Sequence, residues 1–178
     1  MLPTPCARAL VTGASAGLGA EYARQLAARG TALVLSARRA DRLEALAREL
    51  RAAHGVPVEV VTADLSTEEG TARLERLVAG DPALDLLVNN AGYGGRTGFV
   101  RGETADHVAM ARVHVDATIR LTRAALPGMI ARGRGAVVNV ASVAAFSPFS
   151  GAMYSGTKAF LVMFSENLQG ELRSKGIA

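Results

Sequence analysis

The sequence is poor in the residues that mark several classes of protein. It has a single cysteine, Cys6, so no disulfide can form within the chain, which suits a reducing cytoplasm. Tryptophan is absent, and the few aromatic residues do not alternate with basic ones as they do on surfaces that stack single-stranded nucleic acid. No apolar run reaches the roughly 18 residues of a membrane span. The start of the chain, 1–13, lacks the form of a secretory signal. These absences predict a cytoplasmic protein with no membrane and no nucleic acid as partner, and we predict no metal site.

The positive charge of the chain is not gathered in one stretch. The 20 basic residues outnumber the 16 acidic ones, which gives a formal net charge of +4. Arginines alternate with glutamates over 42–51, a pattern typical of a solvated helix face. The charge pattern therefore disfavours nucleic-acid binding, and strong salt dependence of the affinity would be the mark of that function.

The order of apolar runs predicts the fold. The 178 residues indicate one domain, 1–178, with a substantial core. Short apolar runs alternate with segments of helical periodicity. The predicted strands cover 9–11, 31–36, 56–62, 84–88 and 136–140, and the predicted helices cover 20–29, 41–54, 66–79, 104–129 and 151–175. Ser66 and Glu69 form a predicted capping box for the third helix. Such alternation builds an α/β fold, a doubly wound parallel sheet between two layers of helices with right-handed crossovers.

A glycine-rich turn joins the first strand to the first helix. Gly13, Gly17 and Gly19 follow one another within seven residues. Glycines let the backbone turn sharply and approach a ligand closely, and the free amides of the helix that follows favour negative charge. The turn therefore predicts a phosphate site. Its spacing, G-x3-G-x-G, differs from the common dinucleotide fingerprint G-x-G-x-x-G, and a purely structural turn is the alternative.

Polar residues and glycines follow every predicted strand. They are Thr12 with the glycine turn, 37–39, Asp64 and Leu65, 89–92, and Ala141 with Ser142. In a parallel sheet these strand ends share one edge, where ligands bind near the point at which strand order reverses. We therefore expect the chemistry of the protein at this edge.

The end of the second strand indicates which dinucleotide would bind. A site for NAD usually has an acidic residue about 20 residues after the glycines, to accept a hydrogen bond from the ribose 2′-hydroxyl. This chain has Arg38 and Arg39 there, and no acid. Because the planar guanidinium suits phosphate, the pair favours NADP over NAD. A surface arginine pair without a ligand is the alternative.

Tyr154 and Lys158 are four residues apart in the last predicted helix, so they share one face. An unperturbed tyrosine is a poor acid–base catalyst at neutral pH, and a neighbouring lysine cation stabilises tyrosinate. Such a pair alone is common. However, the chain has only one other lysine, Lys175, so a lysine at this position is informative.

Taken together, these motifs resemble those of the short-chain dehydrogenases/reductases. The stretch 12–19 fits TGxxxGxG, 89–92 fits NNAG and 154–158 fits YxxxK, and the likeness covers the chain from Arg8 to its end. The resemblance implies a Rossmann fold and an NADP(H)-dependent oxidoreductase that acts on a small-molecule carbonyl or alcohol. It also implies a homodimer or homotetramer.

The resemblance also implies roles for individual residues. Tyr154 would be the general acid–base, Lys158 would stabilise its anion and hold the nicotinamide ribose, and Ser142 would hydrogen-bond the substrate oxygen. The residues implied to bind the cofactor are Gly13, Ser15, Ala16, Gly17, Leu18, Gly19, Arg38, Arg39, Asp64, Leu65, Asn90, Ala91, Gly92, Tyr154 and Lys158.

Three features depart from the family pattern. His114 stands where relatives have an asparagine that supports a proton relay, so it is a fourth candidate catalytic residue; a histidine that only packs is the alternative. Ser142 precedes Tyr154 by twelve residues where relatives have thirteen. The sequence stops at Ala178, before the C-terminal strands of the family, so the fifth strand is predicted to be a sheet edge. These departures keep open a second function, a non-catalytic NADP(H)-binding sensor or partner-binding protein.

Overall fold

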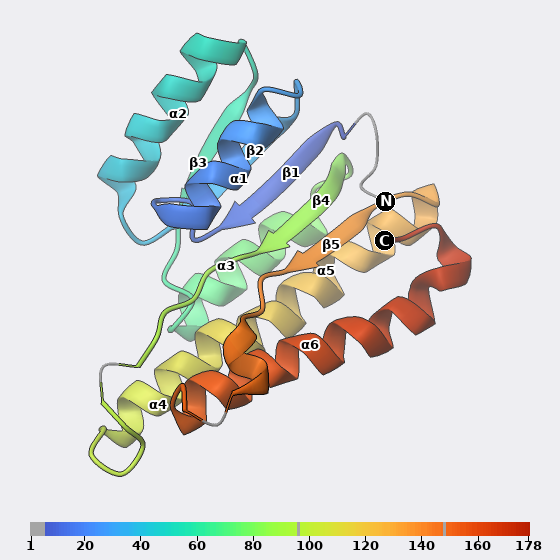
Figure 1. Cartoon of the computed structure of the whole chain (residues 1–178). Coiled ribbons are helices and arrows are strands. Elements are labelled where there is room, and N and C mark those ends of the chain that lie inside the picture. Colours follow the sequence, from blue (N-terminus) through green and yellow to red (C-terminus); the bar gives the residue numbers. More distant parts are fainter. Residues whose placement is uncertain (1–5, 96, 148) are drawn as a thin grey trace.

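The computed structural model describes residues 6–95, 97–147 and 149–178. The described chain contains one five-stranded sheet with the strand order β3-β2-β1-β4-β5. Its strands are β1 (Arg8–Thr12), β2 (Ala32–Ala37), β3 (Val58–Thr62), β4 (Leu84–Asn89) and β5 (Ala136–Asn139). Every pairing is parallel, and the arrowheads of β1, β4 and β5 point the same way in Figure 1. The predicted doubly wound parallel sheet is therefore confirmed.

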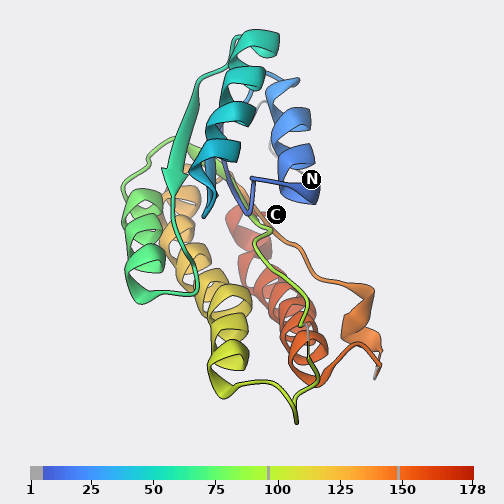
Figure 2. The ribbon, with the colours of Figure 1, turned by 90° about the vertical axis from the view of Figure 1, so that its left-hand side faces the viewer.

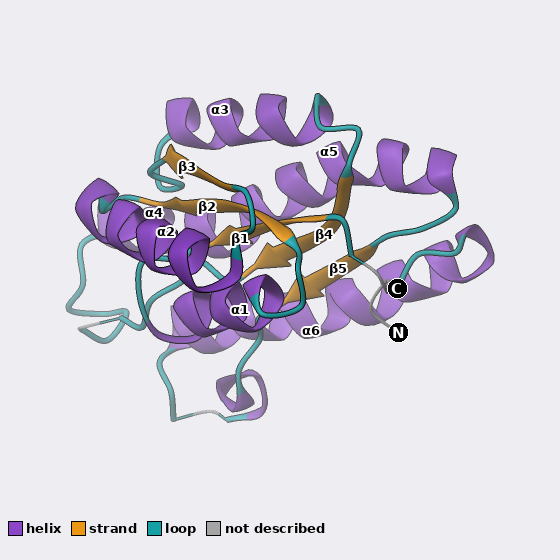
Figure 3. Ribbon diagram, turned by 90° about the horizontal axis from the view of Figure 1, so that it is seen from above, coloured by secondary structure: helices purple, strands orange, loops and turns teal. Residues whose placement is uncertain are grey.

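Helices cover both faces of the sheet. They are α1 (Gly17–Ala27), α2 (Ala40–His54), α3 (Glu68–Ala79), α4 (Thr104–Ala111), α5 (Ala117–Arg132) and α6 (Ala152–Leu172). Viewed from above, the strands lie between α1 and α2 on one side and α3 and α5 on the other (Figure 3). Figure 2 shows α4, in yellow, beside the red α6. Among the described helices, none is long and apolar enough to cross a bilayer.

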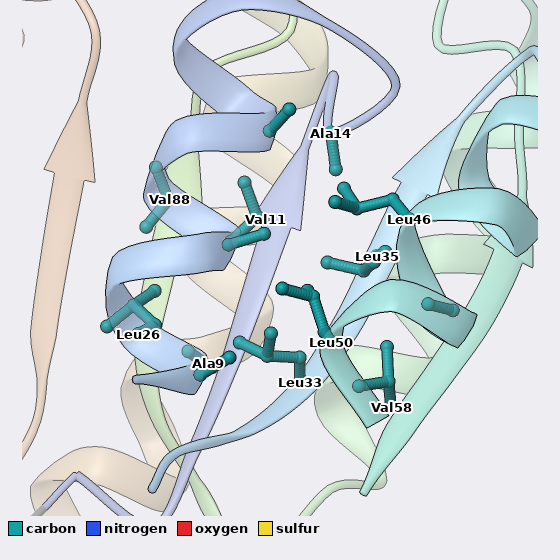
Figure 4. Close-up of a cluster of buried hydrophobic side chains, with 14 of the residues drawn as sticks. Ala9, Val11, Ala14, Leu26, Leu33, Leu35, Leu46, Leu50, Val58 and Val88 are labelled. Carbon is teal, nitrogen blue, oxygen red and sulfur yellow. The ribbon is translucent and has the colours of Figure 1, made fainter. Parts of the chain in front are cut away.

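Two apolar clusters hold the layers together. Successive side chains of a strand point to opposite faces, so Ala9 and Val11 enter the cluster beneath α1 and α2 while Leu10 enters the other. Figure 4 shows the first cluster, where Leu26 of α1 and Leu50 of α2 meet the sheet. Burial on both faces explains why the central strands β1, β2 and β4 are mostly apolar instead of alternating.

The order of strands places the functional edge. β1 pairs with β2 on one side and with β4 on the other. The chain passes from β1 to β2 on one side of the sheet and from β4 to β5 on the other side. The strand order therefore reverses between β1 and β4. The loops after these strands therefore diverge and leave a crevice at the carboxyl edge.

The prediction of one regular α-helix over 104–129 is wrong. This segment consists of α4, a π-helical turn over Arg112–Asp116, and α5, which continues to Arg132. The wider turn hydrogen-bonds five residues back, and the apolar pattern of the sequence does not distinguish it from an α-helical turn. It contains His114.

The predicted capping box is also wrong by one residue. Thr67, not Ser66, caps α3, and its hydroxyl accepts a hydrogen bond from the amide of Gly70 at 3.1 Å. Ser66 instead donates its amide and hydroxyl hydrogens to the carboxylate of Asp64. The adjacent hydroxyl residues compete for the cap, and Asp64 retains the first of them.

β5 is an edge strand of the described sheet, as predicted, and its outer side is partly covered. Ile177 forms a parallel bridge with Gly135, the amide of Val137 donates to the carbonyl of Ala178 at 2.9 Å, and the amide of Ala178 donates to the carbonyl of Gly135 at 3.0 Å. Gly176 allows this return with a φ of +73°. The last residues of the chain therefore begin to pair along β5.

Candidate functional site

A cleft of about 530 Å³ opens at the carboxyl edge of the sheet. Most of the predicted site residues line it, and they come from the ends of all five strands and the start of α6. They are Gly13, Ser15, Ala16, Gly17, Leu18, Arg38, Arg39, Asp64, Leu65, Asn90, Ala91, Gly92, Ser142, Tyr154 and Lys158. Gly19 and His114 are the predicted site residues that lie behind its walls. The structure therefore brings both ends of the predicted site into one cavity.

The glycine turn closes one end of the cleft. Gly13 and Gly17 have φ angles of +66° and +57°, which side chains rarely adopt. A Cβ on Gly13 would also lie 2.8 Å from the amide nitrogen of Asn90 and 2.9 Å from the Cα of Ala91. Gly19 packs against the carbonyl of Gly13 and lets α1 approach the turn. Three glycines thus serve two needs, a sharp turn and close packing.

The amino end of α1 faces this turn. Its capping residue, Ala16, has no side-chain oxygen to accept from the first amides of the helix. These orphan amides, together with the helix dipole, provide a site for an anion. A phosphate at the turn would satisfy them.

Thr12 and Asn90 join the two central strands beneath the cleft. The hydroxyl of Thr12 donates to the carbonyl of Val88 at 3.2 Å and accepts from the amides of Asn90 and Ala91, each at 3.0 Å. The side-chain amide of Asn90 donates to the carbonyl of Thr12 at 2.8 Å. Because Thr12 is buried, these bonds fix the spacing between the ends of β1 and β4.

Arg38 and Arg39 line the cleft at the same end as the glycine turn. Both are exposed, and Arg39 donates from Nε and Nη2 to the hydroxyl of Ser15, at 3.2 and 2.9 Å. Arg38 acts on Asp64: partial burial raises the pKa of that carboxyl, but the two hydrogen bonds from Ser66 and the charge of Arg38 outweigh it and leave the pKa below its ordinary value. The carboxylate is thus kept ionised beside a cationic rim.

Tyr154 and Lys158 line the other end of the cleft, on consecutive turns of α6. The Nζ of Lys158 lies 5.8 Å from the centroid of the Tyr154 ring and donates to the carbonyl of Val140 at 2.6 Å. Only 5% of Lys158 is exposed, and this burial lowers the pKa of its ammonium group. A cation held in this way is a fixed charge beside the phenol ring.

Ser142 lies next to this pair, after β5. It caps a 3₁₀ turn over Val143–Phe146, and its hydroxyl accepts from the amide of Ala144 at 3.1 Å. An oxygen that accepts here keeps its own hydrogen free to donate into the cleft. The twelve-residue spacing to Tyr154 therefore still brings both side chains to one cavity.

His114 lies behind the wall of the cleft, with 1% of its surface exposed. Its Nε2 accepts from the amide of Tyr93 at 3.0 Å, and its Nδ1 lies 2.8 Å from the hydroxyl oxygen of Thr157. Burial, and to a lesser degree the charge of Lys158, lower the pKa of the imidazole to about 4. The ring is therefore neutral at physiological pH, with both nitrogens hydrogen-bonded.

The sequence prediction missed several residues of the cleft. Ser36, near the end of β2, lines it, and its hydroxyl is buried without a hydrogen-bond partner in the described structure. Val113 and Val140 also line it. A signal for Ser36 was present, because it is a polar residue in an otherwise apolar strand. Val113 and Val140 have no such signal.

Known proteins resemble the chain over nearly its whole length. A family model for short chain dehydrogenases matches residues 7–178. An uncharacterized oxidoreductase of Myxococcus xanthus is 42% identical over 171 residues, and a serine 3-dehydrogenase of Agrobacterium fabrum is 39% identical over 171 residues. These matches cover 95% and 94% of the chain and, in each case, 67% of the relative.

The solved structures agree. A short-chain dehydrogenase from Sphingobium yanoikuyae, in complex with NADPH, superposes with a TM-score of 0.94 at 40% identity, over 96% of this chain and 68% of that one. The strand order and the helices on both faces are thus those of a known fold. The chain belongs to the short-chain dehydrogenase family.

Proposed function

We propose that the protein is an NADP(H)-dependent oxidoreductase that transfers a hydride between the nicotinamide and a carbonyl or secondary alcohol, with Tyr154 as the acid–base. One observation carries the proposal. A single cleft has an anion site and two arginines at one end, and a tyrosine beside a buried lysine cation at the other. Short-chain dehydrogenases with this fold include one in complex with NADPH, which supports the same function.

The lining of the cleft fits NADPH. At Gly17, where a Cβ would meet nothing within 4 Å, a pyrophosphate would lie against the backbone, and the amides of α1 would bind it. Arg38 and Arg39 would hold the 2′-phosphate, whose charge and shape suit guanidinium groups. The unpartnered hydroxyl of Ser36 and the sides of Asp64 and Leu65 would meet the adenosine end. This arrangement favours NADP over NAD.

The far end of the cleft would perform the proton chemistry. NADPH, when bound, supplies the hydride. During reduction the phenol of Tyr154 gives its proton to the substrate oxygen, and Ser142 donates a hydrogen bond to the same oxygen. Lys158 stabilises the tyrosinate that remains. Oxidation of an alcohol reverses these steps, with tyrosinate as the base.

The surface next to this end favours an apolar carbonyl compound. Val143 and Phe146, on the 3₁₀ turn after Ser142, expose 88% and 79% of their surface, and Phe149 exposes 94%. Large exposed apolar side chains next to a cleft suit apolar groups of a ligand.

The test is turnover with a tyrosine variant. NADPH oxidation is followed with a panel of ketones and aldehydes, for the parent protein and for Tyr154→Phe. We expect Tyr154→Phe to lower kcat by about 10²–10⁴-fold and to retain NADPH binding. Tyr22→Phe, on α1 and outside the cleft, is the matched control and is expected to keep parental activity. NADPH binding without turnover on any carbonyl would support the alternative, a non-catalytic NADP(H)-binding protein.

We also infer a homo-oligomer. Ile119 and Ile130 of α5 and Met163 of α6 expose between 38% and 57% of their surface. These helices lie on the outer face of the molecule, where a second copy would cover them. Sedimentation at micromolar concentration tests this inference, and a pure monomer would contradict it.

A further inference from the structure

The hydrogen bonds around His114 determine which of its nitrogens carries the proton. The amide of Tyr93 is a donor only, so the Nε2 that it contacts must be an acceptor. The hydroxyl of Thr157 donates its single hydrogen to the carbonyl of Tyr154 at 3.0 Å, so at 2.8 Å it accepts from Nδ1. Both arguments require the same form of the neutral ring, with hydrogen on Nδ1.

The result is one continuous chain of hydrogen bonds. It runs from the amide of Tyr93 through the imidazole to the hydroxyl of Thr157 and ends on the carbonyl of Tyr154. Each donor and acceptor in it has a partner, so the buried ring costs no unsatisfied polar group. Its two ends belong to different elements, the loop after β4 and α6.

Both elements form the reactive end of the cleft. Gly92 and Tyr93 line it from the loop, and Tyr154 and Lys158 line it from α6. The His114 ring also lies edge-on to the rings of both tyrosines, with centroids 5.7 Å from Tyr93 and 5.9 Å from Tyr154. The ring thus lies between the two walls and contacts both of them.

We propose that His114 is a positioning residue: bonded to the Tyr93 amide and the Thr157 hydroxyl, it fixes the loop after β4 against the helix that carries Tyr154 and Lys158. It reaches no substrate, because it lies behind the cleft wall. This role rests on the proposed function, and it replaces the proton relay that the sequence suggested for this position. Lys158, Tyr93 and Tyr154 are the titratable groups that face the ring.

The first test reads the ring itself and needs no activity. Two-bond ¹H–¹⁵N spectra of protein labelled with ¹⁵N-histidine distinguish the two neutral forms and the cation. The chain has three histidines, so the spectrum of His114→Asn identifies the signal of His114. We expect hydrogen on Nδ1 and a ring that stays neutral from pH 8 to pH 5. A ring with hydrogen on Nε2, or one that becomes a cation between pH 8 and pH 5, overturns the proposal.

The second test asks whether the bridge positions the cleft or only stabilises the fold. NADPH affinity is measured by fluorescence for Thr157→Val, which removes the bridging hydroxyl, and for Thr157→Ser, which keeps it. Thr118→Val is the matched control: it removes a buried hydroxyl of α5 that donates to the backbone carbonyl of His114 and not to the ring. We expect about tenfold weaker NADPH binding for Thr157→Val and parental affinity for the other two.

The outcomes separate the two proposals. Equal NADPH affinity in Thr157→Val and Thr118→Val overturns the positioning role. If Thr157→Val does not fold, His114→Phe replaces it, since phenylalanine keeps a ring in this space and can make neither hydrogen bond of the imidazole. Failure of the parent protein to bind NADPH contradicts the proposed function instead, and the form of the His114 ring then decides whether the bridge exists.

Discussion

The ammonium group of Lys158 donates to the carbonyl oxygen of Val140 at 2.6 Å, which ties α6 to the residue after β5. The cation is almost fully buried, and its lowered pKa shows that the site favours the neutral amine relative to water. A buried lysine cation lowers the stability of the fold, so a role in catalysis explains Lys158 more simply than a role in packing does.

Replacement of this lysine should separate stability from activity. We expect Lys158→Met to abolish turnover and to leave the melting temperature equal or higher, because it removes a buried charge and keeps the apolar stem. The lowered pKa means that the unfolded chain holds this proton more tightly, so the residue's contribution to stability rises with pH below the ordinary 10.5. Melting curves at several pH values measure this. Lys175→Met, at an exposed position, is the control, and a large loss of stability in Lys158→Met would contradict the prediction.

His114 should make the protein sensitive to acid. Its pKa is about 4 in the folded protein and 6.5 when unperturbed, so the unfolded state binds the proton more readily as pH falls through this window. We expect the parent to lose about 2 kcal/mol of stability between pH 7 and pH 5 from this residue alone. Urea unfolding at both pH values should show this loss in the parent and a smaller one in His114→Asn. His54→Asn, at an exposed position, should behave as the parent does.

The arginine pair should determine the choice of dinucleotide. We expect replacement of both Arg38 and Arg39 by alanine to weaken NADPH binding by about 10–100-fold, the effect of losing charge-assisted hydrogen bonds to a phosphate. Binding of NADH, which lacks that phosphate, should change little. Titration with both nucleotides measures the ratio, and Arg48→Ala, exposed on α2 outside the cleft, serves as control. An equal effect on both nucleotides would argue against a 2′-phosphate site.

Gly92 and Gly94 offer a test of the tight packing behind the cleft. A Cβ on Gly92 would lie 3.0 Å from Nε2 of His114 and 3.5 Å from Nζ of Lys158, whereas one on Gly94 would meet nothing within 4 Å. We expect Gly92→Ala to destabilise the protein by about 1–3 kcal/mol and to weaken NADPH binding, because the imidazole must move. Gly94→Ala should match the parent in both measurements. Equal stability and equal NADPH affinity of the two variants would contradict this prediction, because they would show that the loop after β4 can shift to accommodate the added methyl group.

The sequence predicts the sheet and most of the cleft for a specific reason. Runs such as 32–35 are apolar on both faces, so their number and order indicate a covered parallel sheet before any contact is known. Strand ends then share an edge by geometry, which places Thr12 beside Asn90 although they are 78 residues apart. The prediction of most cleft residues depends only on this shared edge.

Other features depend on contacts that a sequence pattern does not contain. The π-helical turn over Arg112–Asp116 has the same apolar spacing as an α-helical turn. The partners of His114 come from the loop after β4 and from α6, 21 and 43 residues away in the chain. Whether His114 takes part in a proton relay or only packs in the helix therefore cannot be decided from the sequence and requires the structure. Likewise, Thr67 and not Ser66 caps α3 because Ser66 is hydrogen-bonded to the carboxylate of Asp64, a contact that the sequence pattern does not reveal.

The hydroxyl of Thr12 has a consequence for ligand binding. One hydrogen and two lone pairs are all that it has, and Val88, Asn90 and Ala91 use all of them. The bottom of the cavity is therefore held together by hydrogen bonds within the protein itself. A nucleotide that binds does not have to order the ends of β1 and β4. The conformational entropy of these segments is lost when the protein folds, and so it does not weaken nucleotide binding.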